Sequence, residues 1–123
     1  MFKLHKKGSA ATEAIEYIVA GVELTPGVLV SFTSGKLVIA TDAPEYVTLG
    51  SAKADELVAV KRIHEDETYE TVLSVEGASL KLGDKVTIDS TGTAVTATTG
   101  GVFEIVEMDG TAVGSKVRGI IVK

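Results

Sequence analysis

The sequence predicts an all-β fold: a small β-sandwich or barrel-like domain built from two similar β-hairpin modules, with an extended N-terminal arm. Three observations carry this prediction. One segment of the chain appears twice. Short runs of alternating apolar and polar residues are separated by turn residues along most of the chain. Thr, Val, Gly and Ala are abundant, which is typical of short strands joined by many turns.

The repeated segment covers residues 24–41 and returns as residues 80–98, where Thr91 is an inserted residue. The identical residues of the first copy are Leu24, Gly27, Val30, Ser34, Gly35, Val38, Ala40 and Thr41. A repeat of this kind indicates two copies of one supersecondary unit. We therefore expect pseudo-repeats over about residues 20–63 and 76–122, within a single β domain of residues 15–123.

Weaker matches extend the repeat beyond its hairpin. They pair apolar residues of the two halves: Val47 with Phe103, Leu49 with Ile105, Leu57 with Val117 and Val60 with Ile120. These matches predict that each module consists of a hairpin, a short strand, a loop and a closing strand.

Alternation and turn residues place the individual strands. In the first half, strands are expected over residues 15–19, 28–32, 36–40, 46–49 and 57–63. In the second half, they are expected over residues 69–75, 86–88, 94–98, 102–107 and 116–122. Pro26-Gly27 predicts a turn, because Pro presets φ and Gly tolerates positive φ. Ser34-Gly35 predicts a tight hairpin turn, and Asp109-Gly110 is a turn signal of the same kind.

Residues 1–14 show no strict period, and Gly8-Ser9-Ala10-Ala11 is a run of small residues. We interpret residues 1–14 as a flexible N-terminal arm, although an ordinary frayed terminus would have the same pattern.

Composition and charge exclude several classes of protein. The net charge of −5 disfavours a broad nucleic-acid-binding surface, which normally carries the opposite sign. No run of about 18 apolar residues is present, so no membrane-spanning helix is expected. The basic N-terminus is not followed by an apolar segment, so a signal peptide is not expected. Cys is absent, which excludes disulfides and thiolate chemistry.

The densest set of potential metal ligands is His64-Glu65-Asp66-Glu67. Neighbouring residues of one loop rarely converge on one ion, so we predict a solvated loop and no metal site. Gly-x-Ser-x-Gly, phosphate-binding and dinucleotide-binding motifs are absent. A hydrolase could use the carboxylates Glu23, Asp84 and Asp89. These residues fall in turns and on strand faces, so we predict no enzyme activity and no cofactor.

The chain resembles the small β-rich decoration (cement) proteins of tailed-bacteriophage heads. The resemblance covers residues 19–122 and lies in four segments: GVELTPGVLV (21–30), VTLG (47–50), LKLGDKVTID (80–89) and VTA (95–97). Such proteins typically have a G-x-x-V entry into a strand and a G-D-x-V turn in the second half. Gly27 to Val30 and Gly83 to Val86 match these two patterns.

This resemblance implies a homotrimer that is made in the host cytoplasm and binds the outer surface of the virion. Its partner would be the shell of major capsid protein, without nucleic acid or membrane. In many such proteins a terminal arm makes the capsid contact. The matching residues here are Met1, Phe2, Lys3, Leu4, His5, Lys6 and Lys7.

A carbohydrate- or receptor-binding β-module on a fibre or surface is the alternative hypothesis. It would use Tyr17, Tyr46 or Tyr69 together with neighbouring carboxylates. The chain has only three Tyr and no Trp, so it is poor in the aromatic platforms that sugar sites favour.

Overall fold

The computed structural model describes residues 1–6, without the side chain of Lys6, and residues 15–122. This part of the chain contains strands and no helix, and so none that could cross a membrane. The strands are β1 (Lys3–Lys6), β2 (Ile15–Val19), β3 (Leu29–Thr33), β4 (Lys36–Ile39), β5 (Tyr46–Thr48), β6 (Leu57–Arg62), β7 (Thr68–Val72), β8 (Lys85–Ile88), β9 (Val95–Thr99), β10 (Phe103–Met108) and β11 (Lys116–Ile121). The predicted all-β class is confirmed.

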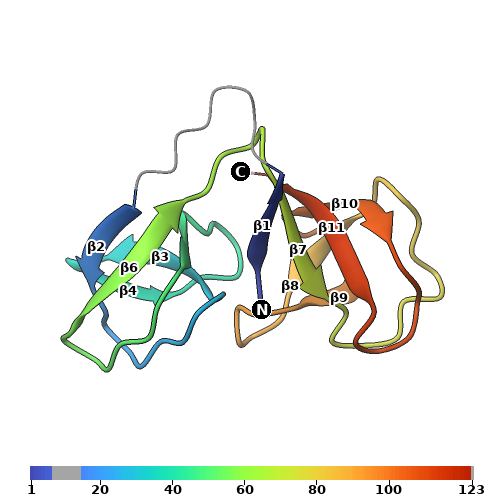
Figure 1. Ribbon diagram of the computed structural model, residues 1–123. Helices are drawn as coiled ribbons and strands as arrows, with labels where there is room; N and C mark the ends of the chain where they lie inside the picture. Colours follow the sequence, from blue (N-terminus) through green and yellow to red (C-terminus); the bar gives the residue numbers. More distant parts are fainter. Residues whose placement is uncertain (7–14, 123) are drawn as a thin grey trace.

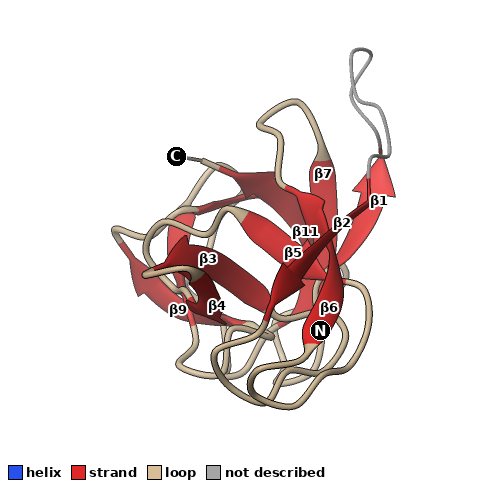
Figure 2. Ribbon diagram, turned by 90° about the vertical axis from the view of Figure 1, so that its left-hand side faces the viewer, coloured by secondary structure: helices blue, strands red, loops and turns tan. Residues whose placement is uncertain are grey.

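The strands form two antiparallel sheets in a sandwich-like domain. The five-stranded sheet has the order β2-β6-β5-β3-β4, and the six-stranded sheet has the order β1-β7-β11-β10-β8-β9. Figure 1 shows the first sheet on the left and the second on the right, and Figure 2 shows the same strands after a 90° turn. We call residues 15–62 module 1 and residues 68–121 module 2.

The two modules have the same topology. The order of module 1 is reproduced by β7-β11-β10-β8-β9 in module 2, and β1 is added at the edge of β7. The strand registers agree as well. Equivalent pairs are Val30 with Tyr46 and Val86 with Phe103, and Thr48 with Val60 and Ile105 with Gly119. The predicted organisation into two similar modules is therefore confirmed, but each module begins with a strand, β2 or β7, that precedes the expected starts at residues 20 and 76.

Both sheets curl in the same way. A parallel bridge joins Ala20 to Leu37 in module 1, and an equivalent bridge joins Leu73 to Val95 in module 2. Each bridge brings the end of the first strand of its module against the third strand along the chain, β4 or β9, which is the last strand in sheet order. The sheets therefore curl toward small barrels, and their concave faces enclose apolar side chains.

The glycines that recur in the repeat explain why it is visible in the sequence. Gly27 and Gly83 have φ of 80° and 94°, and Gly35 and Gly92 have φ of 84° and 72°. These are left-handed conformations, which glycine adopts without a steric penalty. Ser34 also has a positive φ of 51°, so Ser34-Gly35 forms the predicted two-residue turn between β3 and β4.

Beyond the hairpin, the predicted matches are one residue out of register. Val117 is buried, and its equivalent is the buried Val58 rather than the exposed Leu57. The same slip affects Val47, because Tyr46 holds the equivalent position. Side chains alternate along a strand, so a slip of one residue exchanges the buried and exposed faces. Apolar residues on both faces made the two registers look alike in the sequence.

The first six residues are not a free arm. Lys3–Lys6 form β1, which pairs antiparallel with β7. The side chain of Phe2 is 1 % exposed and its ring meets that of Phe103 at a centroid distance of 5.8 Å. The N–H of Phe2 donates a hydrogen bond to the carbonyl of Gly27 in module 1, over 2.8 Å. The prediction of a flexible arm is therefore wrong for residues 1–6, and residues 7–14 lie outside the described residues.

The modules share a continuous apolar joint. Phe2, Leu29 and Val47 belong to the same buried cluster as the core of module 2, although Leu29 and Val47 come from module 1. A second cluster, which includes Val58 and Val60, fills the concave side of module 1. The outer face of the module 1 sheet is therefore covered where it meets module 2.

A buried polar network lies in this joint. Nζ of Lys61, on β6, donates to Oε1 of Glu67 over 2.5 Å and to the hydroxyl of Tyr69 over 3.1 Å. The hydroxyl of Tyr69, on β7, donates to the same carboxylate oxygen over 2.7 Å. All three side chains are buried. An ammonium and a carboxylate thus compensate each other at the point where the chain passes between modules.

The network shifts the pKa values of Glu67 and Tyr69. Burial opposes the charged form of Glu67, but hydrogen bonds from Lys61 and Tyr69 outweigh it and lower the pKa of Glu67. Burial and the hydrogen bond to Glu67 raise the pKa of Tyr69 well above its ordinary value. Glu67 is therefore a carboxylate and Tyr69 a neutral donor near neutral pH.

We expect the substitution Glu67→Gln to lower the free energy of unfolding by about 3–5 kcal/mol, because it leaves the buried ammonium of Lys61 without its counter-charge. Urea denaturation followed by circular dichroism measures the change. Asp42→Asn, at an exposed position, is the matched control and should be nearly neutral. A loss below about 1 kcal/mol for Glu67→Gln would contradict this account.

The Lys61–Glu67 pair also predicts how the free energy of unfolding depends on acidic pH. Because folding lowers the pKa of Glu67, its contribution is present above pH 4.5, the ordinary value, and is lost as the pH falls through the folded-state value. The difference in unfolding free energy between wild type and Glu67→Gln should therefore narrow below pH 4.5. A difference that stays constant from neutral pH to strong acid would refute this linkage.

Close packing at Gly119 gives a further prediction. A Cβ at this position would lie 2.2 Å from the carbonyl oxygen of Glu104 and 2.7 Å from the ring of Phe103. We expect Gly119→Ala to destabilise the protein by about 1–3 kcal/mol through overpacking, measured by urea denaturation. Gly50→Ala is the control, since no described atom lies within 4 Å of its added Cβ. Equal effects of the two substitutions would contradict the prediction.

Candidate interaction surface

The predicted N-terminal contact residues do not form one exposed arm. Exposed side chains in this segment are those of Met1, Lys3 and His5. Phe2 and Leu4 pack into or against the core instead. The side chains of Lys6 and Lys7 lie outside the described part of the chain. An apolar segment that covers a neighbouring core cannot at the same time extend freely to a partner.

The three tyrosines of the sugar-binding hypothesis do not share a platform. Tyr69 is buried in the joint, and Tyr46 is buried with its hydroxyl accepting a hydrogen bond from Nη2 of Arg62 over 2.7 Å. Only Tyr17, with 67 % exposure, presents its ring to solvent. The structure therefore offers one exposed aromatic ring among these three.

The carboxylates of the hydrolase hypothesis serve separate turns. Asp84 accepts a hydrogen bond from the N–H of Lys81 over 2.9 Å, and Asp89 accepts one from the hydroxyl of Thr91 over 2.7 Å. Within the described residues, no three His, Asp or Glu side chains are placed to hold a metal ion. Glu67 of the predicted acidic loop is instead committed to Lys61.

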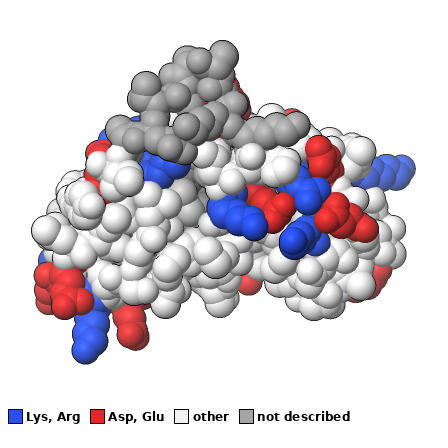
Figure 3. All heavy atoms as spheres, in the orientation of Figure 1, with Lys and Arg blue, Asp and Glu red and all other residues white. Residues whose placement is uncertain are grey.

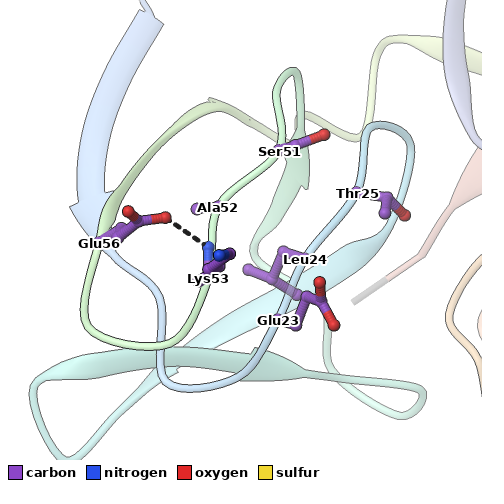
Figure 4. A pocket seen from close by; sticks show the side chains of 7 residues that line it. All are labelled: Glu23, Leu24, Thr25, Ser51, Ala52, Lys53 and Glu56. Atoms are coloured by element: carbon purple, nitrogen blue, oxygen red, sulfur yellow. Dashed lines mark hydrogen bonds between the residues drawn. The ribbon is translucent and has the colours of Figure 1, made fainter.

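Glu23 lies in a shallow depression between two loops of module 1 (Figure 4). The residues that line it are Glu23, Leu24, Thr25, Ser51, Ala52, Lys53 and Glu56. The N–H of Leu24 donates to the carbonyl of Ala52 over 2.8 Å, and a carboxylate oxygen of Glu56 accepts from the N–H of Lys53 over 2.7 Å. The first contact joins the two loops and the second lies within one of them, and neither forms a pair of a nucleophile and a base.

The most distinctive surface is the outer face of module 1, which we call the module 1 face. Its members are Ile15, Tyr17, Val19, Leu49, Leu57 and Ala59. Tyr17 pairs with Ala59 and Val19 pairs with Leu57, and directly paired residues of an antiparallel ladder share one face. The N–H of Leu49 donates to the carbonyl of Ala59 over 2.8 Å, which places Leu49 next in the same row.

The module 1 face is apolar and open to solvent. Tyr17 and Leu57 are 67 % and 63 % exposed, and Ile15 and Leu49 are 55 % and 45 % exposed. The same side of the sheet continues into Lys61, which is buried at the joint. Contiguous exposed apolar side chains of this size mark interaction surfaces in soluble proteins.

Module 2 provides an internal comparison for this face. The registers make Glu70 the equivalent of Tyr17, Arg118 the equivalent of Ala59 and Lys116 the equivalent of Leu57. The same fold thus places charged residues at these outer positions in module 2 and apolar residues in module 1. Figure 3 shows this contrast, with blue and red atoms over β1, β7 and β11 and a largely uncharged surface over β2 and β6.

The charges on module 2 compensate one another. Arg118 donates from Nε to Glu70 over 2.9 Å and from Nη1 to Asp109 and Glu107 over 2.9 and 3.1 Å. Lys3 of β1 lies 3.1 Å from the other oxygen of Glu70, and its hydrogen bond lowers the pKa of that carboxyl. This face of module 2 is therefore adapted to water, whereas the module 1 face is not.

The two sheets also differ in whether the edge of their first strand is covered. The outer edge of β7 is covered by β1. The equivalent strand β2 pairs with β6 alone among the described strands, so its other edge is unpaired along Ile15–Val19. Just beyond β2, the N–H of Gly21 donates to the carbonyl of Leu37 on β4 over 2.7 Å. Open edges are templates for pairing with another chain, and proteins normally protect them.

No protein-family model matches the chain, and no curated protein sequence matches it. Among solved structures, the chain is similar to the head fiber gp8.5 N base of bacteriophage phi29, with a TM-score of 0.67 and 18 % sequence identity. The match covers 89 % of this chain and 94 % of that chain. The chain therefore shares its fold, over nearly its whole length, with a structural component of a phage head.

If the module 1 face is a surface and not part of a core, charges on it should be tolerated by the folded monomer. We expect Tyr17→Lys and Leu57→Glu to change the free energy of unfolding by no more than about 0.5 kcal/mol, measured at protein concentrations where single chains predominate. Val58→Lys, on the buried side of β6, is the control and should abolish folding. Large losses in both surface variants would show that the face is covered from within the chain.

Proposed function

We propose that this chain is a structural protein of phage heads that binds the outer surface of the capsid as a decoration protein. The observation that carries the proposal is the shared fold with a head fiber base over 89 % of the chain. The hydrogen-bonding roles of Asp84, Asp89 and Glu67 agree with it, because these carboxylates serve turns and the joint.

The structure is suited to such a mechanical role. Two curled sheets share one apolar joint, and a buried ion pair holds this joint together. A rigid body that contacts two neighbouring capsid subunits raises the free energy needed to separate them. Binding to the assembled shell and not to its dissociated subunits stabilises the shell by mass action.

The proposed partner is the shell of major capsid protein, and the proposed location is the outer surface of the virion after synthesis in the host cytoplasm. We assign the capsid contact to the exposed side chains of the N-terminal strand region, Met1, Lys3 and His5. Phe2 and Leu4 are excluded from it because the core uses them.

A second candidate function is the base of a head fibre, because the similar solved structure is itself described as a head fiber base. Both functions require binding to the phage head. They differ in whether the protein also carries a further fibre segment.

Co-sedimentation with matured heads that lack this protein tests the proposal. We expect saturable binding of the wild-type chain. The double variant Lys3→Gln/His5→Gln should bind at least about fivefold more weakly than the wild type, because loss of about 1 kcal/mol of contact energy has this effect. Lys85→Gln, on β8 of module 2, is the matched control for loss of a surface charge.

The possible outcomes test the head-binding role and the position of the contact separately. Absence of saturable binding by the folded wild-type protein would refute the head-binding role. Binding that is unchanged in the double variant would keep the role and place the contact on another surface. Deleting the first eleven residues would not test the contact alone, because it would also remove β1 and leave a cavity where Phe2 packs.

A further inference from the structure

We infer that the open edge of β2 and the module 1 face together form a self-association surface. Its occupant is β2 of a second copy of this chain, paired antiparallel about a two-fold axis at Tyr17. This inference does not depend on the proposed capsid-binding role.

The backbone of β2 is oriented for such pairing. The N–H of Ala20 donates to the carbonyl of Glu56, so Ala20 turns its backbone groups toward the strand that follows Glu56, β6. Successive residues of a strand point their backbone groups to opposite sides. Ile15, Tyr17 and Val19 therefore direct their N–H and C=O groups away from β6, toward the open edge.

Module 2 shows that this edge of the fold accepts a strand. Its equivalent, on β7, pairs antiparallel with β1 through Lys3 opposite Glu70 and Leu4 opposite Tyr69. The two modules have the same strand order and the same bridge at the end of the first strand. An antiparallel strand beside β2 would thus reproduce an arrangement that the chain already contains.

The sequence of β2 is complementary to itself. With a two-fold axis at Tyr17, this residue faces its own counterpart, and Ile15 faces Val19 of the second copy. The apolar side chains of Ile15, Tyr17 and Val19 then meet those of the second copy across the strand pair. Glu16 faces Ile18 of the second copy, so the two carboxylates are not placed opposite each other. The pairing joins the two five-stranded sheets edge to edge.

Composition favours a second copy as the occupant. Each chain carries a net charge of −5, which opposes association of two copies, so their contact must lie on a surface that adds no like charges of its own. The module 1 face has no charged member, and its Tyr, Leu and Ile residues match the composition of contacts between identical subunits, which are more apolar than transient interfaces.

The surface is also accessible. Figure 1 places β2 at the side of module 1 that faces away from module 2. A second copy could therefore pair with β2 without displacing β1 or opening the joint.

Cysteine cross-linking tests the pairing directly, because the chain contains no cysteine. Hydrogen-bonded partners in an antiparallel ladder have Cα atoms about 5.5 Å apart, which is within the range for a disulfide. We expect Tyr17→Cys to form a covalent dimer under mild oxidation. Val113→Cys, equally exposed but in module 2, should form much less and controls for random collision. Circular dichroism checks that both variants are folded.

Light scattering of the wild type and of Tyr17→Lys completes the test. We expect a mass of two chains for the wild type and a dissociation constant at least about tenfold higher for the variant, because two lysines would then face each other across the strand pair. A wild-type protein that remains a single chain at high concentration would overturn the inference. So would a mass of three chains, the homotrimer that the resemblance to decoration proteins implies, because three copies cannot share one two-fold strand pair. Cross-linking of Tyr17→Cys to capsid protein and not to itself would also overturn it.

Discussion

The buried pair of Lys61 and Glu67 is the constraint on which the arrangement of the two modules depends. Lys61 belongs to the outer side of the module 1 sheet, and its ammonium is compensated only when Glu67 and Tyr69 are brought against it. Burial makes an uncompensated charge far more costly than an unpaired surface charge. The pair therefore selects one relative placement of the modules. Apolar residues such as Leu29 and Val47 add burial to that placement but are less directional.

Duplication gives this protein an internal control for the meaning of its surfaces. The fold alone does not require an apolar outer face, because module 2 has the same strand order and presents Arg118 and Glu70 in the equivalent places. The fold alone also does not require an open edge, because β1 covers the edge of β7. Both differences fall on the same strand, β2. Their coincidence is better explained by a partner at this site than by two unrelated substitutions.

The paired N-terminal strand affects how the proposed contact with a phage head would be made. A free arm would lose conformational entropy on binding, whereas a strand that is already paired has lost it during folding. Phe2 anchors this segment in the core, and Lys3 pairs with Glu70. Any contact through Met1, Lys3 and His5 is therefore made by a preorganised surface. Such a surface is small, and several weak contacts on an assembled shell would have to act together.

The sequence by itself determined the all-β class, the two modules and the main turns. These features depend on local chemistry: glycines at positive φ, such as Gly27 and Gly83, and alternation of apolar and polar residues. The repeat also predicted the position of the hairpins, because some of its identical residues, such as Gly27 and Val30, are required by a turn or by the concave core.

Only the tertiary structure decided which apolar residues are core and which are surface. Leu57 and Val58 are apolar neighbours, and the repeat predicted the wrong one as buried, because burial here depends on which side of the sheet is concave. The sequence pattern places Phe2 in an arm, because no local signal shows that its ring will contact that of Phe103, 101 residues later. The partner of Glu67 was equally hidden, because a carboxylate in an acidic loop looks solvated until the fold brings Lys61 to it. Long-range contacts carry no local signal, and they decided the core, the joint and the exposed face.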